Sequence, residues 1–374
     1  MSRARETFAL RPRHMSSENG EDTMPRSFTL STAIAAVALV PLWLASSGDA
    51  NAQRVLKIHH QLPASAPVQK ILLEPFARAI ERDTNGRLKI QIFPQMQLGG
   101  APPQIYDQVK DGVVDIGWTL PGYTGGRFPL SALFELPFMI TTAEATTRAF
   151  QEFGAKHLAQ KEYADTHPLL FHVAARMKFH LRKGPITSIE DFKGLRIRAT
   201  HKSMGDALEA YGATPIFMPV PQVPASLQRG VVDGAVIPWE VVVPLRVYEL
   251  VSYHSLIETE RGFIVPAFVL TMNKKVYESL EPDLKAAIDK NSGANIAQKI
   301  GKAYDEVEQV GYELAKKRGN KFNVIDPAEV ERMVKLSEPV RREWIAAVTA
   351  KGYNGLALMH EANALINGYT NMAR

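Results

Sequence analysis

The strongest constraint on the fold is an order of strand, helix, strand, helix and strand that occurs twice along the chain. The first occurrence runs from VLKIHHQLP through RLKIQIFP to VVDIGWTL, and the second runs from GLRIR through TPIFMPV to VVDGAVI. In both, the last strand begins Val-Val-Asp and follows a helix pattern that ends in glycine. This spacing predicts mostly parallel, doubly wound sheets in two related α/β halves.

The segments between and after these units complete the expected order of elements. Residues 141–165 have a helical pattern, and residues 169–182 form a long extended stretch that we interpret as the crossing into the second half. The stretch beginning LEPDLK predicts one very long helix, or two helices joined near residues 291–293. A further strand, KFNVID, and closing helices follow.

A short stretch of the second half points to ligand binding. Ser188 and Asp191 have the spacing of a helix cap, and Gly194 suits the left-handed turn that would follow. Arg198 ends the next strand, directly before a helix that Thr200 can cap. Ligands of α/β proteins bind at such strand ends, and a guanidinium grips a carboxylate with two parallel hydrogen bonds. A surface ion pair is the alternative for Arg198.

Composition excludes several functional classes. The chain has 374 residues, enough for two domains, and no cysteine, so disulfides, zinc–cysteine sites and thiol nucleophiles are excluded. The net charge is +5, and the basic residues are scattered along the chain. The chain has no basic run of the kind that would indicate a nucleic-acid partner. No G-x-S-x-G elbow, H-E-x-x-H pair or phosphate-binding loop occurs, so we predict that the protein is not an enzyme. We expect no metal and no cofactor, and we interpret His59 and His60 as structural.

The N-terminal segment predicts export. A charged start at Arg26 precedes the apolar run of residues 33–45, and small residues lead to a cleavage site near Ala52. The run is too short for a membrane span, so an uncleaved anchor is the weaker alternative. The mature chain would then begin near Gln53, and we expect it in the periplasm.

Several motifs together resemble the solute-binding proteins of TRAP transporters, which are secondary importers of organic acids. The motifs are IHHQLP, GRLKIQIFPQMQLGG, DGVVDIGWTLPGY, LFELPFM, SIEDFKGLRIRAT and YGATPIFMPVPQVPASLQRGVVDGAVIPWE, in this order along nearly the whole mature chain. The resemblance implies a two-lobed periplasmic clamp, in which each lobe is a mixed β-sheet flanked by helices and a long helix spans both lobes. It places residues 53–175 and about 264–303 in the first lobe, and residues 176–263 and about 304–374 in the second.

The resemblance also implies a receptor function and a set of pocket residues. The protein would capture a small organic acid and deliver it to the TRAP membrane permease, which would be its only contact with the membrane. Arg198 matches the family's principal carboxylate-binding arginine. The other positions that it assigns to the pocket are Gln61, Leu120, Tyr123, His201, Val220, Ile237 and Trp239. A receptor of an ATP-driven importer is the alternative within binding proteins.

Two departures from the family pattern bear on the ligand. A second arginine that is common in relatives aligns with Lys178, with Arg176 on the same strand face, and either could reach the ligand. Ile237 replaces a common asparagine, and Trp239 follows it. The apolar and aromatic groups favour an aromatic or branched monocarboxylate, whereas a dicarboxylate would use Lys178 or Arg176 for its second charge.

Overall fold

The computed structural model describes residues 53–373, which lie in one compact unit and form two β-sheets. The expected leader and cleavage site therefore lie outside the described residues. The first sheet has the order β2 (Leu88–Phe93), β1 (Arg54–His59), β3 (Ile116–Thr119), β10 (Ala267–Asn273) and β4 (Thr166–Val173). The second has the order β11 (Lys321–Val324), β9 (Tyr253–Leu256), β5 (Lys178–Leu181), β8 (Gly234–Ile237), β6 (Arg196–Ala199) and β7 (Thr214–Phe217).

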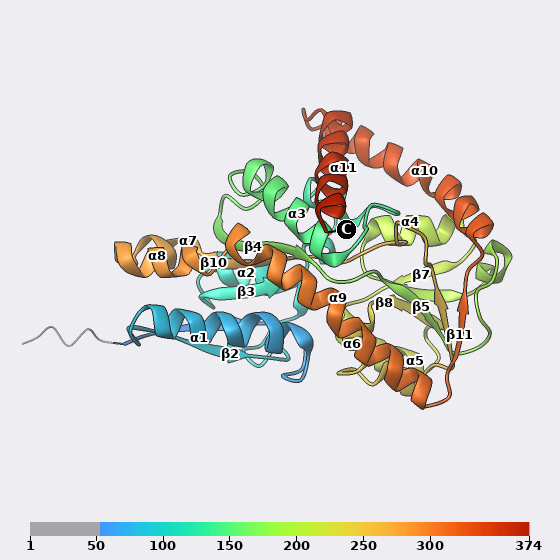
Figure 1. The fold of residues 1–374 in the computed structure, drawn as a ribbon, viewed down its shortest axis with the longest axis horizontal. Coiled ribbons are helices and arrows are strands. Elements are labelled where there is room, and N and C mark those ends of the chain that lie inside the picture. The colour runs from blue at the N-terminus through green and yellow to red at the C-terminus, as the bar shows by residue number, and fades with distance from the viewer. Residues whose placement is uncertain (1–52, 374) are drawn as a thin grey trace, which may run out of the picture. The chain divides into compact units, whose positions relative to one another are not determined.

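Helices flank both sheets (Figure 1). They are α1 (Glu74–Asp83), α2 (Ile105–Lys110), α3 (Ala143–His157), α4 (Lys202–Ala210), α5 (Val223–Gln228), α6 (Trp239–Val242), α7 (Lys274–Glu278), α8 (Pro282–Lys290), α9 (Ala294–Lys317), α10 (Pro327–Thr349) and α11 (Gly355–Met372). A π-helical turn, η1, covers Val68–Leu73. The 3₁₀ turns are η2 (Pro102–Gln104), η3 (Pro121–Tyr123), η4 (Ser131–Glu135), η5 (Ile189–Phe192), η6 (Val220–Gln222) and η7 (Val247–Glu249). No helix in residues 53–373 is both long and apolar enough to cross a membrane.

The two halves repeat one topology. Strands β1, β2 and β3 are parallel, as are β6, β7 and β8. The Oδ2 atom of Asp115 accepts a hydrogen bond from the backbone N–H of Lys57 at 2.8 Å, and that of Asp233 accepts one from Arg196 at 3.0 Å. Each aspartate directly precedes one parallel strand (β3 or β8), and its carboxylate binds the backbone of the neighbouring parallel strand (β1 or β6). This contact gives the repeated Val-Val-Asp a structural explanation.

Each sheet is mixed because a strand from another part of the chain joins the parallel set. Strand β10 runs antiparallel to β3 and β4, and β5 runs antiparallel to β8 and β9. The alternating pattern predicts only the parallel strands, since β10 returns to the first sheet from about 150 residues further along the chain than β3. We call the first sheet with its helices the first lobe, and the second sheet with its helices the second lobe.

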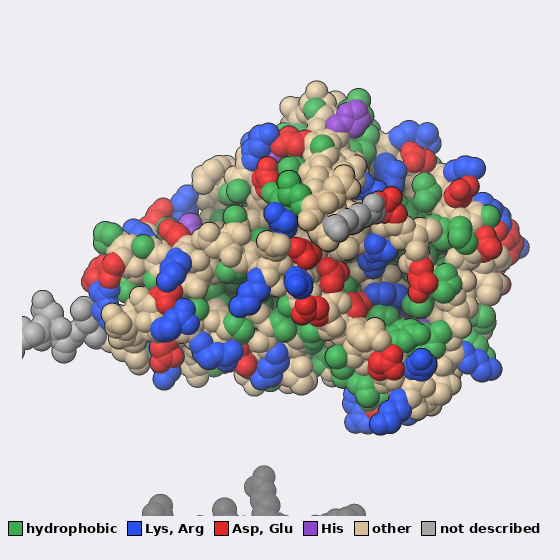
Figure 2. Space-filling model, viewed as in Figure 1, with side chains coloured by type: hydrophobic (Ala, Val, Ile, Leu, Met, Phe, Trp, Pro, Cys, Tyr) green, Lys and Arg blue, Asp and Glu red, His purple; other side chains and the backbone are tan. Residues whose placement is uncertain are grey.

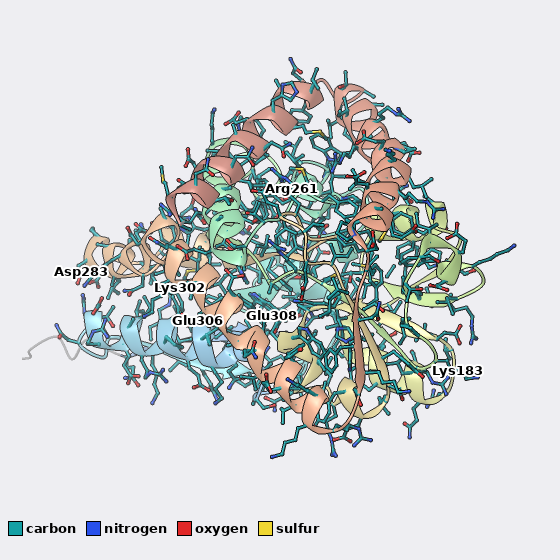
Figure 3. The ribbon with its side chains drawn as sticks, turned by 45° about the vertical axis from the view of Figure 1, so that its right-hand side comes forward. Lys183, Arg261, Asp283, Lys302, Glu306 and Glu308 are labelled. Carbon is teal, nitrogen blue, oxygen red and sulfur yellow. The ribbon has the colours of Figure 1, made fainter. Side chains whose placement is uncertain are left out.

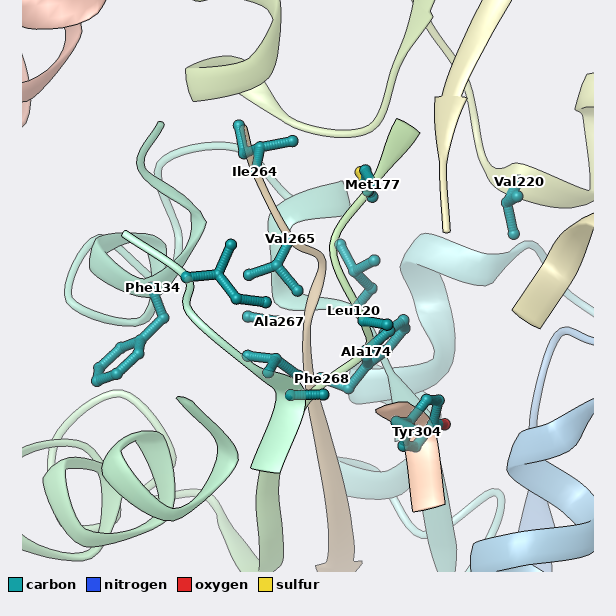
Figure 4. Close-up of a cluster of buried hydrophobic side chains, with 14 of the residues drawn as sticks. Leu120, Phe134, Ala174, Met177, Val220, Ile264, Val265, Ala267, Phe268 and Tyr304 are labelled. Carbon is teal, nitrogen blue, oxygen red and sulfur yellow. The ribbon is translucent and has the colours of Figure 1, made fainter. Parts of the chain in front are cut away.

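Several segments connect the lobes. The stretch expected to be extended over residues 169–182 forms β4 in the first sheet and β5 in the second, and residues 174–177 cross between them. Residues 257–266 return beside that crossing, where the Met177 N–H donates to the carbonyl oxygen of Ile264 at 3.0 Å. Figure 4 shows Ala174, Met177, Ile264 and Val265 on these adjacent segments.

Helix α9 is a further connection. It packs against α3 and β4 in the first lobe and against α6 in the second (Figure 1). Of the two alternatives for this region, the structure has two helices, because Gly293 takes φ +58° between α8 and α9.

Helix α11 differs from the expected division. Residues 304–374 were assigned to the second lobe, whereas α11 packs against α3 of the first. The chain turns back after α10 at Gly352, which has φ +88°, and the buried hydroxyls of Thr141 and Thr370 then meet at 2.6 Å. The exposed face in Figure 2 carries positive and negative side chains intermingled, in keeping with the scattered charge of the sequence.

Candidate functional site

A cavity lies between the lobes, at the carboxyl ends of their parallel strands. Gln61 follows β1 and Leu120 follows β3. Arg198 is the last residue but one of β6, and Ile237 is the last residue of β8. Carboxyl ends of parallel strands leave backbone groups and side chains facing a common space, which is where α/β proteins bind ligands. The repeated topology therefore brings two such edges together around one cavity.

Arg198 is the cationic side chain of this cavity, and it is 1% exposed. Its Nε donates to the carbonyl oxygen of Met218 at 3.0 Å, and its Nη1 donates to the Thr200 hydroxyl at 2.6 Å. Its Nη2 is buried and has no hydrogen-bond partner among the described residues. Burial lowers the pKa of this guanidinium. The arrangement fixes the orientation of the guanidinium and leaves donor capacity for an anion.

Gln61 and Tyr123 add polar groups to the wall. The Tyr123 hydroxyl, in the first lobe, accepts a hydrogen bond from the Val220 N–H of the second lobe at 3.0 Å. Burial raises the pKa of Tyr123, and the nearby positive charge of Arg198 opposes that rise. The Oε1 atom of Gln61 is buried and unpaired among the described residues. These groups could hydrogen-bond a carboxylate or a neighbouring substituent.

The rest of the wall is largely apolar. Trp118 and Phe268 stack with their ring centroids 4.3 Å apart and an interplanar angle of 15°. Trp118 is fixed by a 2.8 Å hydrogen bond from Nε1 to His172 Nε2, and burial lowers the pKa of His172 to about 3. Leu120, Met177, Val220 and Ile237 belong to the same apolar surface. Flat apolar walls with few polar anchors are typical of a site for a small, partly hydrophobic ligand.

Arg176 and Lys178 do not line the cavity. Each of the three nitrogens of the Arg176 guanidinium donates to a backbone carbonyl, of Thr141, Thr259 and Glu260. Lys178 pairs with Glu308 of α9, which Figure 3 labels. Met177 between them lines the cavity instead. Successive side chains of an extended segment point to opposite faces, so when Met177 faces the cavity its two neighbours face away.

Trp239 and His201 also lie outside the cavity lining. Trp239 packs in the interior of the second lobe, with ring centroids 4.7 Å from His180 and 4.6 Å from His254. His201 precedes α4 and its side chain does not cap that helix; neither ring nitrogen has a hydrogen-bond partner among the described residues. Burial lowers the pKa of His201 to about 3, so the ring is neutral.

Several lining residues were not expected from the sequence, and Glu240 is the most polar of them. It follows Trp239 at the start of α6 and is 3% exposed. Trp118 could have been found, because it lies two residues before Leu120 on the same strand face. Phe268 had no such signal, since β10 reaches the cavity from a distant part of the chain. Glu240 lies only three residues after Ile237, but the turn from β8 into α6 decides that Glu240 and not Trp239 lines the cavity.

The two strand histidines have ordinary structural contacts. His59 Nδ1 lies 2.8 Å from Gln108 Oε1, and His60 Nε2 lies 3.1 Å from Gln69 Oε1. Within residues 53–373, no group of three or more histidine, aspartate or glutamate side chains has an arrangement that could hold a metal ion.

Comparison with known proteins gives one family and close structural matches. The family model for bacterial extracellular solute-binding proteins of family 7 matches residues 58–347. A TRAP solute-binding protein from Rhodoferax ferrireducens, with copurified benzoate, is 36% identical with a TM-score of 0.84; the match covers 86% of this chain and 100% of that one.

Two further relatives extend the comparison. A marine metagenome TRAP solute-binding protein specific for aromatic acid ligands, in complex with 3-hydroxybenzoate, is 37% identical with a TM-score of 0.83, covering 85% of this chain and 99% of that one. The 2,3-diketo-L-gulonate-binding periplasmic protein of Escherichia coli is 26% identical over 59% of this chain and 66% of its own length.

Proposed function

This chain belongs to bacterial extracellular solute-binding protein family 7, and from that premise we propose that it captures an aromatic monocarboxylate through Arg198. Proteins of this family are solute-binding receptors, and this chain is a receptor of the TRAP transporter type. Its fold is the two-lobed arrangement of the TRAP solute-binding proteins that it matches.

The observation that carries the carboxylate assignment is the unpaired Nη2 of Arg198. A buried guanidinium that lacks an anionic partner is costly, and a ligand carboxylate supplies that partner with short, charge-assisted hydrogen bonds. The bonds to Met218 and Thr200 hold the guanidinium in place before the ligand arrives. Binding therefore needs little reorganisation of this side chain.

The cavity favours one carboxylate and an aromatic body. Arg198 is the one lysine or arginine among the described residues that line it, and Lys178 is already paired with Glu308. A second carboxylate would be buried without a cation, which costs several kcal/mol. The stacked rings of Trp118 and Phe268 offer an aromatic wall. The relatives that hold benzoate and 3-hydroxybenzoate support the same ligand class.

Capture and delivery follow from the position of the cavity between the lobes. We propose that Arg198 of the second lobe binds the carboxylate first, and that the lobes then close over the ring. The Tyr123–Val220 hydrogen bond joins the lobes beside the ligand in the closed form. The closed receptor would then dock on its membrane permease. The named E. coli relative is periplasmic, and we propose that this chain is likewise exported and cleaved near Ala52.

Thermal unfolding and calorimetry with benzoate and benzamide test the assignment. A ligand that binds only the folded protein raises its stability by about 2.7 kcal/mol at a hundredfold excess over Kd. We expect benzoate to raise Tm and benzamide, which lacks the charge, to leave it unchanged. Arg198→Met should weaken benzoate binding by at least about 3 kcal/mol, the scale of losing one partner of a buried charge pair.

Arg196→Met is the matched control. Arg196 lies on the same strand, but it is exposed and paired with Asp233, so its loss removes a solvent-screened surface ion pair and leaves benzoate affinity unchanged. Equal benzoate affinity in Arg198→Met and the unmodified protein would contradict the proposal, as would equal shifts by benzoate and benzamide.

A further inference from the structure

Glu240 is a buried carboxyl group in a wall that is otherwise mostly apolar. It lies in the first turn of α6, directly after the strand end that carries Ile237, and it lines the cavity. Its Oε2 atom is buried and has no hydrogen-bond partner among the described residues. No ion pair within residues 53–373 joins Glu240 to Arg198, although both line the same space. Glu240 is therefore a second polar group of the cavity, separate from Arg198, which is proposed to bind the ligand carboxylate.

The surroundings of Glu240 disfavour a negative charge on its side chain. Burial raises the pKa of Glu240 well above its ordinary value, the Glu308 carboxylate raises it further, and Lys178 acts in the opposite direction. Lys178 cannot neutralise Glu240 fully because it is paired with Glu308. Glu308 also accepts a hydrogen bond from the backbone N–H of Glu240 at 2.9 Å, which fixes the start of α6 against α9.

The packing around Glu240 supplies no hydrogen-bond partner to its Oε2 atom within residues 53–373. Tyr304 of α9 lies near enough for the two groups to affect each other's charge, yet its hydroxyl also has no hydrogen-bond partner among the described residues. Figure 4 places Tyr304 in the buried cluster that includes the lining residues Leu120 and Phe268. An unpaired buried carboxyl group costs free energy unless something else satisfies it.

We infer that Glu240 determines specificity by hydrogen-bonding a neutral polar substituent of the ligand, a hydroxyl or carbonyl group carried on the ring whose carboxylate pairs with Arg198. The inference rests on the proposed function, because the carboxylate must first orient the ligand. A protonated carboxyl group donates one hydrogen bond and accepts another, so it matches a hydroxyl in either role. A ring with an apolar substituent at that place would leave Glu240 unpaired in the complex.

Isothermal titration of the purified protein with matched ligands tests this inference. Each of 2-, 3- and 4-hydroxybenzoate is compared with the methylbenzoate substituted at the same position, which has a similar size and no hydrogen bond. We expect at least one hydroxybenzoate to bind about tenfold more tightly than its methyl counterpart, because a site built for a hydroxyl rejects an analogue that lacks it. If no hydroxybenzoate exceeds its methyl counterpart, the inference fails.

Two variants assign the preference to Glu240. Glu240→Met keeps the length of the side chain and removes its hydrogen bonds, so the ratio of the methylbenzoate and hydroxybenzoate Kd values within the variant should fall to about one. Glu240→Gln keeps a donor and an acceptor and should retain the preference. A preference that survives in Glu240→Met assigns the substituent site to another residue and overturns the inference.

Benzoate, which has no ring substituent, tests the proposed function separately from the role of Glu240. Benzoate binding without any hydroxyl preference leaves the proposed function standing and overturns the role of Glu240. Failure of benzoate and all the substituted benzoates to bind overturns the proposed function and this inference together. Should Glu240→Met fail to fold, Glu240→Leu takes its place, because leucine also lacks both hydrogen-bonding oxygens and has a similar volume.

Discussion

Glu135 and His201 place two titratable side chains against each other where the lobes meet. Glu135 belongs to η4 of the first lobe and His201 precedes α4 of the second; His201 Nδ1 and Glu135 Oε2 are 3.9 Å apart. Burial raises the pKa of Glu135 to about 8, whereas burial and the positive charge of Arg198 together lower the pKa of His201 to about 3. Both groups are therefore neutral near pH 7, and the contact is not an ion pair.

This pair predicts a loss of stability as the pH rises towards 8. The folded pKa of Glu135 is above its unfolded value, so its stabilising contribution is complete below about pH 4.5 and is lost as the pH rises through about 8, by up to about 1.4 kcal/mol per pH unit. His201 has the opposite sign, and its contribution is complete above about pH 6.5. Urea unfolding between pH 6.5 and 8 should show a decline in stability.

Glu135→Gln should flatten that decline, because the amide does not titrate. Exposed Glu331, on α10, supplies the control variant Glu331→Gln, which should keep the wild-type pH profile. A Glu135→Gln profile as steep as the wild-type profile would show that Glu135 titrates near its unfolded pKa in the native protein.

At the scale of elements, α9 holds the two lobes through two close contacts. A Cβ atom on Gly301 would lie 2.5 Å from Glu144 Cα of α3, and one on Gly311 would lie 2.7 Å from the Trp239 carbonyl oxygen of α6. Both neighbours are backbone atoms, which cannot move aside as a flexible side chain can. The two glycines let one helix approach both lobes, and α9 is thereby fixed as a rigid connection.

Gly301→Ala and Gly311→Ala should each lower the free energy of unfolding by about 1–3 kcal/mol, because overpacking at a backbone contact outweighs the gain in helix propensity. Gly368→Ala in α11 is the matched control. It is exposed and has no atom within 4 Å of the added Cβ, so it should be neutral or stabilising by up to about 1 kcal/mol. Denaturant unfolding of the three variants measures this; equal effects would contradict the close-contact explanation.

At the scale of the molecule, the crossings and α9 suggest how the lobes move. Residues 174–177 and 257–266 lie side by side between the sheets, and Arg176 ties them together through the carbonyl oxygens of Thr259 and Glu260. We propose that the lobes divide at these crossings, with α11 moving with the first lobe. Because Arg198 and Tyr123 come from different lobes, a ligand that contacts both favours the closed form.

Small-angle X-ray scattering measures that closure. The radius of gyration should fall when benzoate saturates the protein, since ligand contacts with both lobes stabilise the compact arrangement. Arg198→Met at the same benzoate concentration should scatter like the ligand-free protein. An unchanged radius of gyration in a sample that calorimetry shows to be saturated would contradict hinge closure.

The sequence by itself determined the parallel strands and the helices between them, their order, and the position of Arg198 at a strand end. Those features depend on local patterns: alternation for strands, helical spacing, a capping box at Ser188 and a left-handed glycine at Gly194, all of which the structure confirms. The repeated Val-Val-Asp strands also indicated two related halves before any packing was known. Local propensity is sufficient where neighbouring residues decide the conformation.

Only the tertiary structure decided which side chains reach the cavity. Along the first crossing the alternation is clear in the sequence, yet its phase is set by contacts with distant segments, so Met177 faces the cavity while Arg176 and Lys178 bind Thr259 and Glu308. Tertiary packing likewise decides the positions of Trp239, Glu240 and α11. A one-residue change of phase moves every side chain to the other face, and the free energy that selects one phase comes from burial against residues far away in the chain.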